Sequence, residues 1–215
     1  MSEIVNKKIE TYVEEHSQNE PELLQKLNKE TWENIHSPRM LSGHYQGRLL
    51  SMLSKLLQPK TILEIGTYTG YSAICMAEGL RPDGKLHTID INKDLYDLQR
   101  RYFDLSEYGQ SIIQHVGDAK EIIPTIDATF DLVFIDADKR GYKKYVELVL
   151  PKMSSGGVIL SDNVLWKGKV IETDPKKTDN RTKSLQEFNV FMNTHPQLES
   201  IVLPIRDGLT LSRVK

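Results

Sequence analysis

The sequence is poor in the features that mark secreted, membrane-spanning and thiolate-metal proteins. It has one cysteine, Cys75, among 215 residues, which excludes a disulfide or a thiolate cluster within one chain. No apolar run approaches the roughly 18 residues of a membrane span. The amino-terminus begins with polar residues rather than with the basic flank and apolar stretch of a secretory leader. These absences favour a cytoplasmic protein with no membrane partner.

Neither sign of charge is in large excess. The chain has 28 Lys and Arg residues against 30 Asp and Glu residues, and 39% of its residues are apolar. This composition argues against a disordered chain and against a strongly basic nucleic-acid binder. A chain of this length can bury the core of one large α/β domain but not of two ordinary domains. We therefore expect a single domain, residues 1–215.

Apolar residues at helical spacing dominate the amino-terminal part of the chain. They recur in three groups, at residues 4–13, 23–27 and 49–57. This spacing predicts two or three helices. Pro38 and Gly43 interrupt the pattern, so we expect a helical arm, residues 1–40, followed by a core, residues 41–215.

Beyond Pro59, short apolar runs rich in β-branched residues alternate with segments of helical length. The runs are residues 61–65, 85–89, 111–116, 132–135 and 158–160. Such alternation is typical of strand-helix-strand units that form a parallel sheet.

The carboxyl-terminal part of the chain has a different pattern. A helix at residues 184–192 precedes two strand-like runs, 200–204 and 209–214, which flank the turn Arg206-Asp207-Gly208 and predict an antiparallel hairpin. We therefore predict an α/β fold with a doubly wound, mostly parallel, seven-stranded sheet, a carboxyl-terminal antiparallel hairpin and an amino-terminal helical arm. The polar segment 167–183 is expected to be mobile.

The end of the first predicted strand indicates a ligand site. Glu64 closes the strand, and Gly66 and Gly70 follow before a helix, which is where α/β sheets bind ligands. A dinucleotide fingerprint needs glycines where Tyr68 and Tyr71 stand, which argues against NAD and FAD. An acidic residue here suits a ligand with an ammonium group, such as S-adenosylmethionine.

The next two strand ends carry carboxylates as well. Asp90 ends the second strand, where a carboxylate can accept hydrogen bonds from both hydroxyls of a ribose. Asp118 and Ala119 follow the third strand and can line an adenine. Glu64 and Asp118 could instead only cap the turns that follow them. Acidic residues at three successive strand ends make the ligand site the stronger interpretation.

Oxygen ligands for a metal gather at the fourth and fifth strand ends. The fourth strand ends at Asp136 and the fifth at Asp162-Asn163. One right-handed crossover separates them, so the two strands are expected to be parallel neighbours about 4.8 Å apart. Two carboxylates and an amide suit a hard divalent cation such as Mg²⁺. Lys139 would face the same place, unless it is an exposed lysine paired with Asp138.

Six motifs together resemble one known family. They are residues 40–50, Glu64-Ile65-Gly66-Thr67-Tyr68-Thr69-Gly70-Tyr71-Ser72, Asp136-Ala137-Asp138-Lys139, Gly156-Gly157, residues 162–168 and Arg206-Asp207-Gly208-Leu209-Thr210. The chain resembles the cation-dependent O-methyltransferases, the group of caffeoyl-CoA and catechol O-methyltransferases and their bacterial relatives. The resemblance implies transfer of a methyl group from S-adenosylmethionine to a hydroxyl.

The resemblance also assigns roles to residues. The implied ligands of Mg²⁺, or of another hard divalent cation such as Mn²⁺ or Ca²⁺, are Asp136, Asp162 and Asn163. Lys139 is the implied general base, with Asp136 beside it in the catalytic site. The expected cofactor-binding residues are Met40, Ser42, Glu64, Gly66, Thr67, Tyr68, Ser72, Asp90, Asp118, Ala119, Asp136 and Asp138.

Elementary chemistry is consistent with these roles. A phenolic hydroxyl with a pKa of about 10 is a poor nucleophile at neutral pH, and chelation by a divalent cation favours its oxyanion. Lys139 could then take the proton if it were neutral part of the time. We expect the adjacent cation and partial burial to lower its pKa for that purpose.

The acceptor is less well defined than the donor. Basic residues gather near the predicted metal site, and they are Lys139, Arg140, Lys143, Lys144, Lys167, Lys169, Lys176, Lys177, Arg181 and Lys183. Such a surface could attract a carboxylated phenol, a CoA thioester or RNA phosphates. A small phenolic or catechol substrate is our expectation, and 5-hydroxyuridine in tRNA is the alternative. A non-catalytic cofactor-binding protein is a third hypothesis, and the resemblance implies a homodimer.

Overall fold

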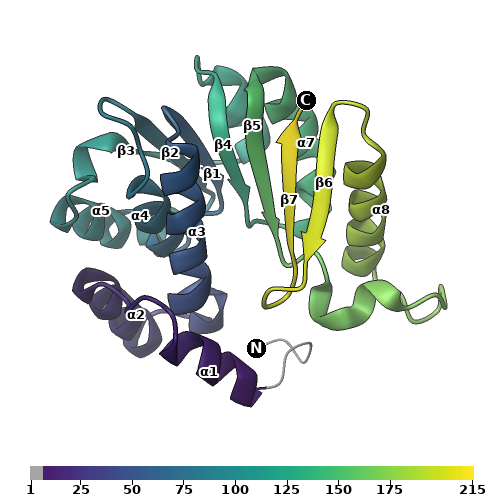
Figure 1. Cartoon of the computed structure of the whole chain (residues 1–215), viewed down its shortest axis with the longest axis horizontal. Coiled ribbons are helices and arrows are strands. Elements are labelled where there is room, and N and C mark those ends of the chain that lie inside the picture. Colours follow the sequence, from purple (N-terminus) through teal and green to yellow (C-terminus); the bar gives the residue numbers. More distant parts are fainter. Residues whose placement is uncertain (1–6) are drawn as a thin grey trace.

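The computed structural model describes residues 7–215 and is built around a seven-stranded sheet (Figure 1). The strands are β1 (Thr61–Ile65), β2 (Lys85–Asp90), β3 (Ile112–Val116), β4 (Phe130–Ile135), β5 (Met153–Asp162), β6 (Leu198–Leu203) and β7 (Leu209–Val214). Their order in the sheet is β3-β2-β1-β4-β5-β7-β6, and β1 to β5 are parallel. β7 pairs antiparallel with both β5 and β6. The predicted fold is confirmed, including the hairpin.

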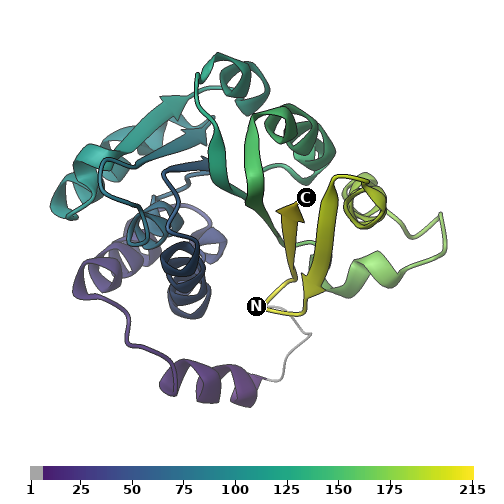
Figure 2. The same cartoon turned by 45° about the horizontal axis from the view of Figure 1, so that its top comes forward.

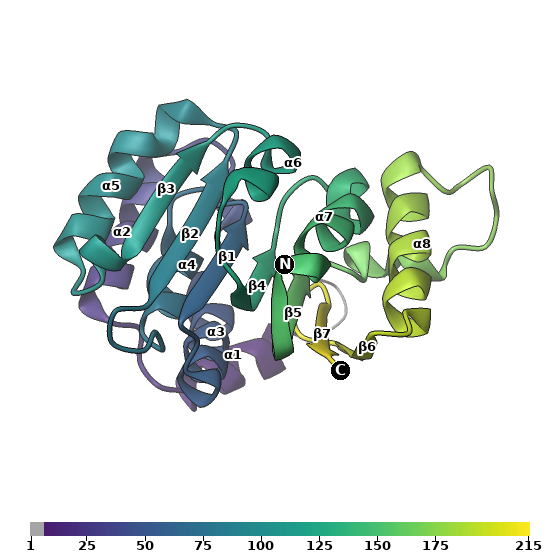
Figure 3. The ribbon, with the colours of Figure 1, turned by 90° about the horizontal axis from the view of Figure 1, so that it is seen from above.

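Helices cover both faces of the sheet (Figure 3). The α-helices are α1 (Lys7–Glu15), α2 (Glu22–Asn34), α3 (Gly43–Leu57), α4 (Tyr71–Ala77), α5 (Tyr96–Leu105), α6 (Ala119–Ile122), α7 (Tyr142–Val149) and α8 (Asn180–Thr194). α2 to α5 contribute to one buried apolar cluster, and α6 to α8 contribute to the other. β1 and β4 are buried on both faces, which explains why their sequences are almost continuously apolar.

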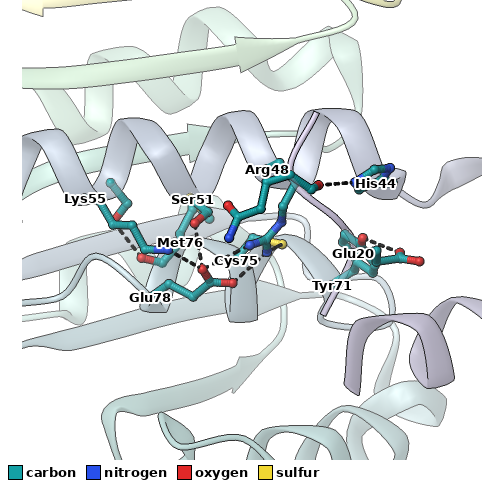
Figure 4. Close-up of polar contacts among 11 residues, drawn as sticks. Glu20, His44, Arg48, Ser51, Lys55, Tyr71, Cys75, Met76 and Glu78 are labelled. Carbon is teal, nitrogen blue, oxygen red and sulfur yellow. Dashed lines mark hydrogen bonds and ion pairs between the residues drawn. The ribbon is translucent and has the colours of Figure 1, made fainter. Parts of the chain in front are cut away.

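A buried ion pair joins α3 to the end of α4 (Figure 4). Arg48 Nη2 lies 2.6 Å from Glu78 Oε1, and both side chains are almost completely enclosed. Ser51 Oγ and Lys55 Nζ each donate a further hydrogen bond of 2.7 Å to Glu78. α3 is thereby fixed against the helix that follows β1.

The amino-terminal arm is helical, as predicted, and is attached to the core by side-chain hydrogen bonds. Tyr71 of α4 donates to Glu20 at 2.5 Å, and Tyr102 of α5 donates to Glu30 at 2.7 Å. Figure 2 shows α1 at the periphery of the molecule, where it contacts α3. The predicted start of the arm, residues 1–6, lies outside the described residues.

The polar segment 167–183 is partly helical. Its first residues belong to the short 3₁₀-helix η7 (Trp166–Ile171), and α8 begins at residue 180 rather than at 184. Asp179 starts α8 because its carboxylate accepts a 2.8 Å hydrogen bond from the Thr182 backbone N–H. Mobility of this segment stays a prediction. Among the helices of residues 7–215, none has the length and apolarity needed to cross a membrane.

Candidate active site at the carboxyl edge of the parallel strands

A cavity of about 1700 Å³ lies at the carboxyl ends of the parallel strands. The strand order reverses between β1 and β4, and such a reversal is where open α/β sheets form ligand crevices. The arm and the hairpin tip complete the cavity wall. The predicted site residues that line it are Met40, Ser42, Gly66, Thr67, Tyr68, Ser72, Asp90, Asp118, Ala119, Asp136, Asp138, Lys139, Asp162 and Asn163.

Glu64 is the predicted residue that does not reach this cavity. It is fully buried and accepts hydrogen bonds of 2.5 Å from the hydroxyls of Ser72 and Thr88. Burial raises the pKa of the Glu64 carboxyl to about 8. Alternation along β1 turns this side chain to the face covered by α4, so Ser72 stands between Glu64 and the cavity.

The turn after β1 brings the backbones of two strands together. Gly66 has φ +104°, and a Cβ added there would lie 2.0 Å from the backbone oxygen of Asp136. Only glycine fits this approach. The same turn holds Asp90, whose carboxylate accepts a 2.7 Å hydrogen bond from the Tyr68 backbone N–H and a 2.8 Å bond from that of Asn92.

Asp118 combines the two interpretations considered for it. Its side chain caps α6 by accepting a 2.8 Å hydrogen bond from the Lys120 backbone N–H, and it also lines the cavity. The capping hypothesis is therefore confirmed for Asp118, and it does not exclude contact with a ligand.

The amino group of the predicted base, Lys139, contacts two of the three predicted metal ligands. Lys139 Nζ lies 2.9 Å from Asp136 Oδ1, 2.7 Å from Asn163 Oδ1 and 2.6 Å from the Tyr142 hydroxyl. Asp138 pairs instead with Arg140 at 3.0 Å, so the alternative Lys139–Asp138 pair does not form. The ends of β4 and β5 are therefore joined through the buried ammonium group of Lys139.

Asn163 has an uncommon backbone conformation that serves this arrangement. Its φ of +57° lies in the left-handed region, which asparagine enters more readily than most residues. Its backbone N–H donates a 2.8 Å hydrogen bond to Asp162 Oδ1. The turn at the end of β5 thereby brings the amide of Asn163 to Lys139.

The charges at the site perturb one another. Burial and the neighbouring carboxylate of Asp136 raise the pKa of Asp162. Burial disfavours the ammonium of Lys139, but Asp136, Tyr142 and Asp162 outweigh it and raise the pKa of Lys139. The protein alone thus favours the charged lysine, whereas the sequence led us to expect a lowered pKa with a cation bound. The carboxylates that surround the lysine are the reason.

The chemistry of these side chains fits a hard divalent cation. Asp136, Asp162 and Asn163 offer two carboxylates and an amide oxygen, which are ligands of the type that Mg²⁺, Mn²⁺ and Ca²⁺ prefer. Two of the three residues already contact the positive charge of Lys139. No group of three or more His, Cys, Asp or Glu residues suited to a metal occurs within residues 7–215, so the third ligand of a cation held here would be the amide oxygen of Asn163.

Three further residues contact the site without having been predicted as members of it. Gln46 Nε2 donates a 2.8 Å hydrogen bond to Asp162 Oδ2, and Arg206 donates to Gln46 Oε1. Tyr142 donates to the Asp162 backbone oxygen at 2.9 Å. Gln46 and Arg206 lie in motifs that carry the family resemblance, which was the available signal.

The fold and this site define a class I methyltransferase with the Rossmann-like sheet, which takes its methyl group from S-adenosylmethionine. Residues 14–215 match the family model for O-methyltransferase. A caffeoyl-CoA O-methyltransferase from Petroselinum crispum is 32% identical over 207 residues, which cover 90% of this chain and 84% of the relative. The chain therefore belongs to the O-methyltransferase family and is an enzyme of the caffeoyl-CoA O-methyltransferase type.

Solved structures agree with this assignment. The O-methyltransferase TomG from Streptomyces achromogenes, in complex with SAM, is 32% identical with a TM-score of 0.86, covering 97% of this chain and 96% of its own. The SAH-bound methyltransferase PaMTH1 from Podospora anserina is 29% identical with a TM-score of 0.88, covering 97% of this chain and 94% of its own.

Proposed function

We propose that this chain transfers the methyl group of S-adenosylmethionine to a hydroxyl of a small catechol-type or phenolic acceptor, assisted by a divalent cation. The observation that carries the proposal is the convergence of Asp136, Asp162, Asn163 and Lys139 on the wall of one cavity. The other wall of that cavity is the turn after β1 together with Asp90.

The donor half of the cavity would hold the nucleoside and the amino acid part of S-adenosylmethionine. Backbone N–H groups already fix the carboxylate of Asp90, so it can accept hydrogen bonds from ribose hydroxyls without reorganising. Ser72 would present its hydroxyl to the donor while the buried Glu64 holds that hydroxyl in place. The backbone of Gly66 would allow close approach of the ligand, because no side chain stands there.

The acceptor half would bind and deprotonate the hydroxyl. Asp136, Asp162 and Asn163 would hold the cation, which lowers the pKa of a hydroxyl that coordinates it. Lys139 would take the proton at Nζ. A cation that shares the carboxylates of Asp136 and Asp162 opposes the charge of this lysine, which favours its neutral form. Holding oxygen and methyl group in line would contribute most of the acceleration.

Aromatic and basic residues in the lining of the cavity support an aromatic acceptor that carries negative charge. Trp32, Tyr45 and Trp166 line the cavity, and so do the basic residues Arg39, Arg140, Lys167, Lys169 and Arg181. Aromatic side chains suit a flat ring, and cations attract carboxylate or phosphate groups. The relative from Petroselinum crispum is named for caffeoyl-CoA, a compound of that kind.

The test is transfer of a radiolabelled methyl group from S-adenosylmethionine to caffeoyl-CoA and to a simple catechol, with and without EDTA. We expect transfer that EDTA abolishes, that added Mg²⁺ or Mn²⁺ restores, and that Asp162→Ala removes. Glu199→Gln, which changes an exposed carboxylate on β6, is the matched control and should retain activity.

Three outcomes would contradict parts of the proposal. Transfer that is insensitive to EDTA would refute the role of the cation. Labelling of bulk tRNA from cells that lack this protein, without labelling of either phenol, would refute the acceptor class. Binding of S-adenosylmethionine without transfer to any of these acceptors would favour a non-catalytic protein.

A further inference from the structure

The tip of the β6–β7 hairpin packs against the loop that follows Asn163. Gly208, with φ +87°, accepts a 3.1 Å hydrogen bond from the Val164 backbone N–H, and Asp207 accepts one of 2.9 Å from that of Leu165. A Cβ added to Gly208 would lie 2.4 Å from Leu165 Cγ, so a larger residue does not fit. The hairpin thereby supports the loop that carries a proposed metal ligand.

Arg206, at the same tip, reaches the opposite side of the cavity. Its Nη1 donates to the Ser42 backbone oxygen at 2.5 Å, and its Nη2 donates to the Leu41 backbone oxygen at 3.3 Å. Leu41 and Ser42 both line the cavity. Arg206 has φ +51°, in the left-handed region that residues other than glycine adopt mainly where surrounding contacts enforce it.

Gln46 lies between Arg206 and Asp162, and its side-chain amide can bond to both in one orientation only. A guanidinium has donors alone and a carboxylate has acceptors alone, so the amide must turn its oxygen to Arg206 and its nitrogen to Asp162. Gln46 is 1% exposed and Asp162 is 2% exposed, which excludes competition by bulk water. The second oxygen of Asp162 accepts from the Asn163 backbone. Both oxygens of this carboxylate are therefore oriented by fixed donors.

From this chain of contacts we infer that Gln46 and Arg206 are positioning residues that couple the two halves of the site. Gln46 orients Asp162 for the cation, and Arg206 holds Gln46 and the backbone of Leu41 and Ser42 together. A cation that fixes Asp162 therefore also fixes the wall beside the methyl donor, and each ligand strengthens the binding of the other. The inference rests on the proposed function, in which Asp162 holds the cation and Ser42 lines the donor site.

The experiment measures both affinities and their coupling. Mn²⁺ binding is followed by electron paramagnetic resonance, with and without S-adenosylhomocysteine, and S-adenosylhomocysteine binding by calorimetry, with and without Mn²⁺. For the wild type we expect each ligand to tighten the other by about five-fold or more. Thermal unfolding of every variant, without ligands, separates lost stability from lost coupling.

Gln46→Met breaks the connection while Arg206 keeps its bonds to the backbone of Leu41 and Ser42. We expect Mn²⁺ binding to weaken by about 10–100-fold and the coupling to fall to about one. Binding of S-adenosylhomocysteine without Mn²⁺ should stay within about two-fold of the wild type. Arg206→Met should weaken both ligands. Arg213→Met, which removes an exposed arginine from β7, is the matched control and should change neither affinity.

If Gln46→Met does not fold, Gln46→Leu replaces it, because leucine also loses the donor to Asp162 and adds no charge beside the proposed cation site. Folded variants at Gln46 whose Mn²⁺ affinity and coupling stay within about two-fold of the wild type would overturn this inference alone. A lower melting temperature with unchanged affinities would overturn it too, since that is the result of a purely structural role. A wild type that binds no Mn²⁺ would overturn the proposed cation site and this inference together.

Discussion

The buried pair Arg48–Glu78 allows a sharp test of how the scaffold of the site is stabilised. Glu78→Met removes the carboxylate and leaves a guanidinium whose side chain is 6% exposed. Arg48 Nη2 keeps a 3.4 Å hydrogen bond to Cys75 Sγ, but a thiol sulfur is a weak acceptor. Arg48 Nε lacks a hydrogen-bond partner even in the unchanged protein. Removing one partner of a buried pair costs about 3–5 kcal/mol, because the other charge is left uncompensated.

For a protein of this size, that loss lowers the melting temperature by about 6–20 °C. The double variant Arg48→Met with Glu78→Met removes both charges, so its free energy of unfolding should lie above that of Glu78→Met alone. Urea unfolding at pH 7 measures these free energies. Glu199→Met, which breaks an exposed ion pair with Arg213, is the control and should cost about 1 kcal/mol or less.

The pH dependence of the free energy of unfolding is a second test of the Arg48–Glu78 pair. Burial opposes the charge of Glu78, but hydrogen bonds from Arg48, Lys55 and Ser51 outweigh it and lower its pKa below 4.5. The contribution of the pair is therefore complete above pH 4.5 and is lost as the pH falls through the lower pKa of the folded state. A loss of less than about 1 kcal/mol in the free energy of unfolding of Glu78→Met would refute the reasoning. So would a loss in the double variant equal to the sum of the losses in Arg48→Met and Glu78→Met.

Three further predictions concern other parts of the fold. Gly66→Ala should abolish binding of S-adenosylmethionine measured by calorimetry, because the new Cβ would displace the backbone of Asp136; unchanged affinity would contradict this. Burial and the neighbouring His115 lower the pKa of His87 to about 4. Between pH 6.5 and about pH 4 the unfolded state therefore binds more protons than the folded state, so the free energy of unfolding falls as the pH falls through this range. His87→Gln should reduce that fall in urea unfolding compared at pH 7 and pH 5. Lys139→Met should slow single-turnover methyl transfer by about 10²–10⁴-fold while circular dichroism stays unchanged; activity within ten-fold of the wild type would contradict its role as a base.

The sheet could be predicted because each of its parallel strands is marked by a short local pattern in the sequence. Each parallel strand is a short apolar run, and the residue that follows it reaches the same edge whatever the rest of the chain does. That rule was sufficient to bring Asp90, Asp136 and Asp162 to one cavity. The start of α8 was missed, although Asp179 carried a capping signal.

The parts that could not be predicted depend on contacts between distant residues. Glu64 was assigned to the cavity because it ends a strand, but the covering helix α4 encloses it through Ser72. Gln46 meets Asp162 and Arg206 across sequence separations of 116 and 160 residues, and no local pattern encodes such contacts. The pKa of Lys139 likewise depends on which carboxylates surround it.

The hairpin also has a consequence for synthesis of the protein. At about 5–20 residues per second, many seconds separate the appearance of Gln46 from that of Arg206 on the ribosome. Once β5 has been synthesised, it has no antiparallel neighbour until β7 follows, so its open edge is available to chaperones or to another nascent chain. A chain cut between α8 and β6 would contain every proposed metal ligand and also Gln46, but it would lack Arg206, which holds Gln46 in place. Synthesis of the β6–β7 hairpin is therefore the step at which β5 gains its antiparallel neighbour and Gln46 gains its contact with Arg206.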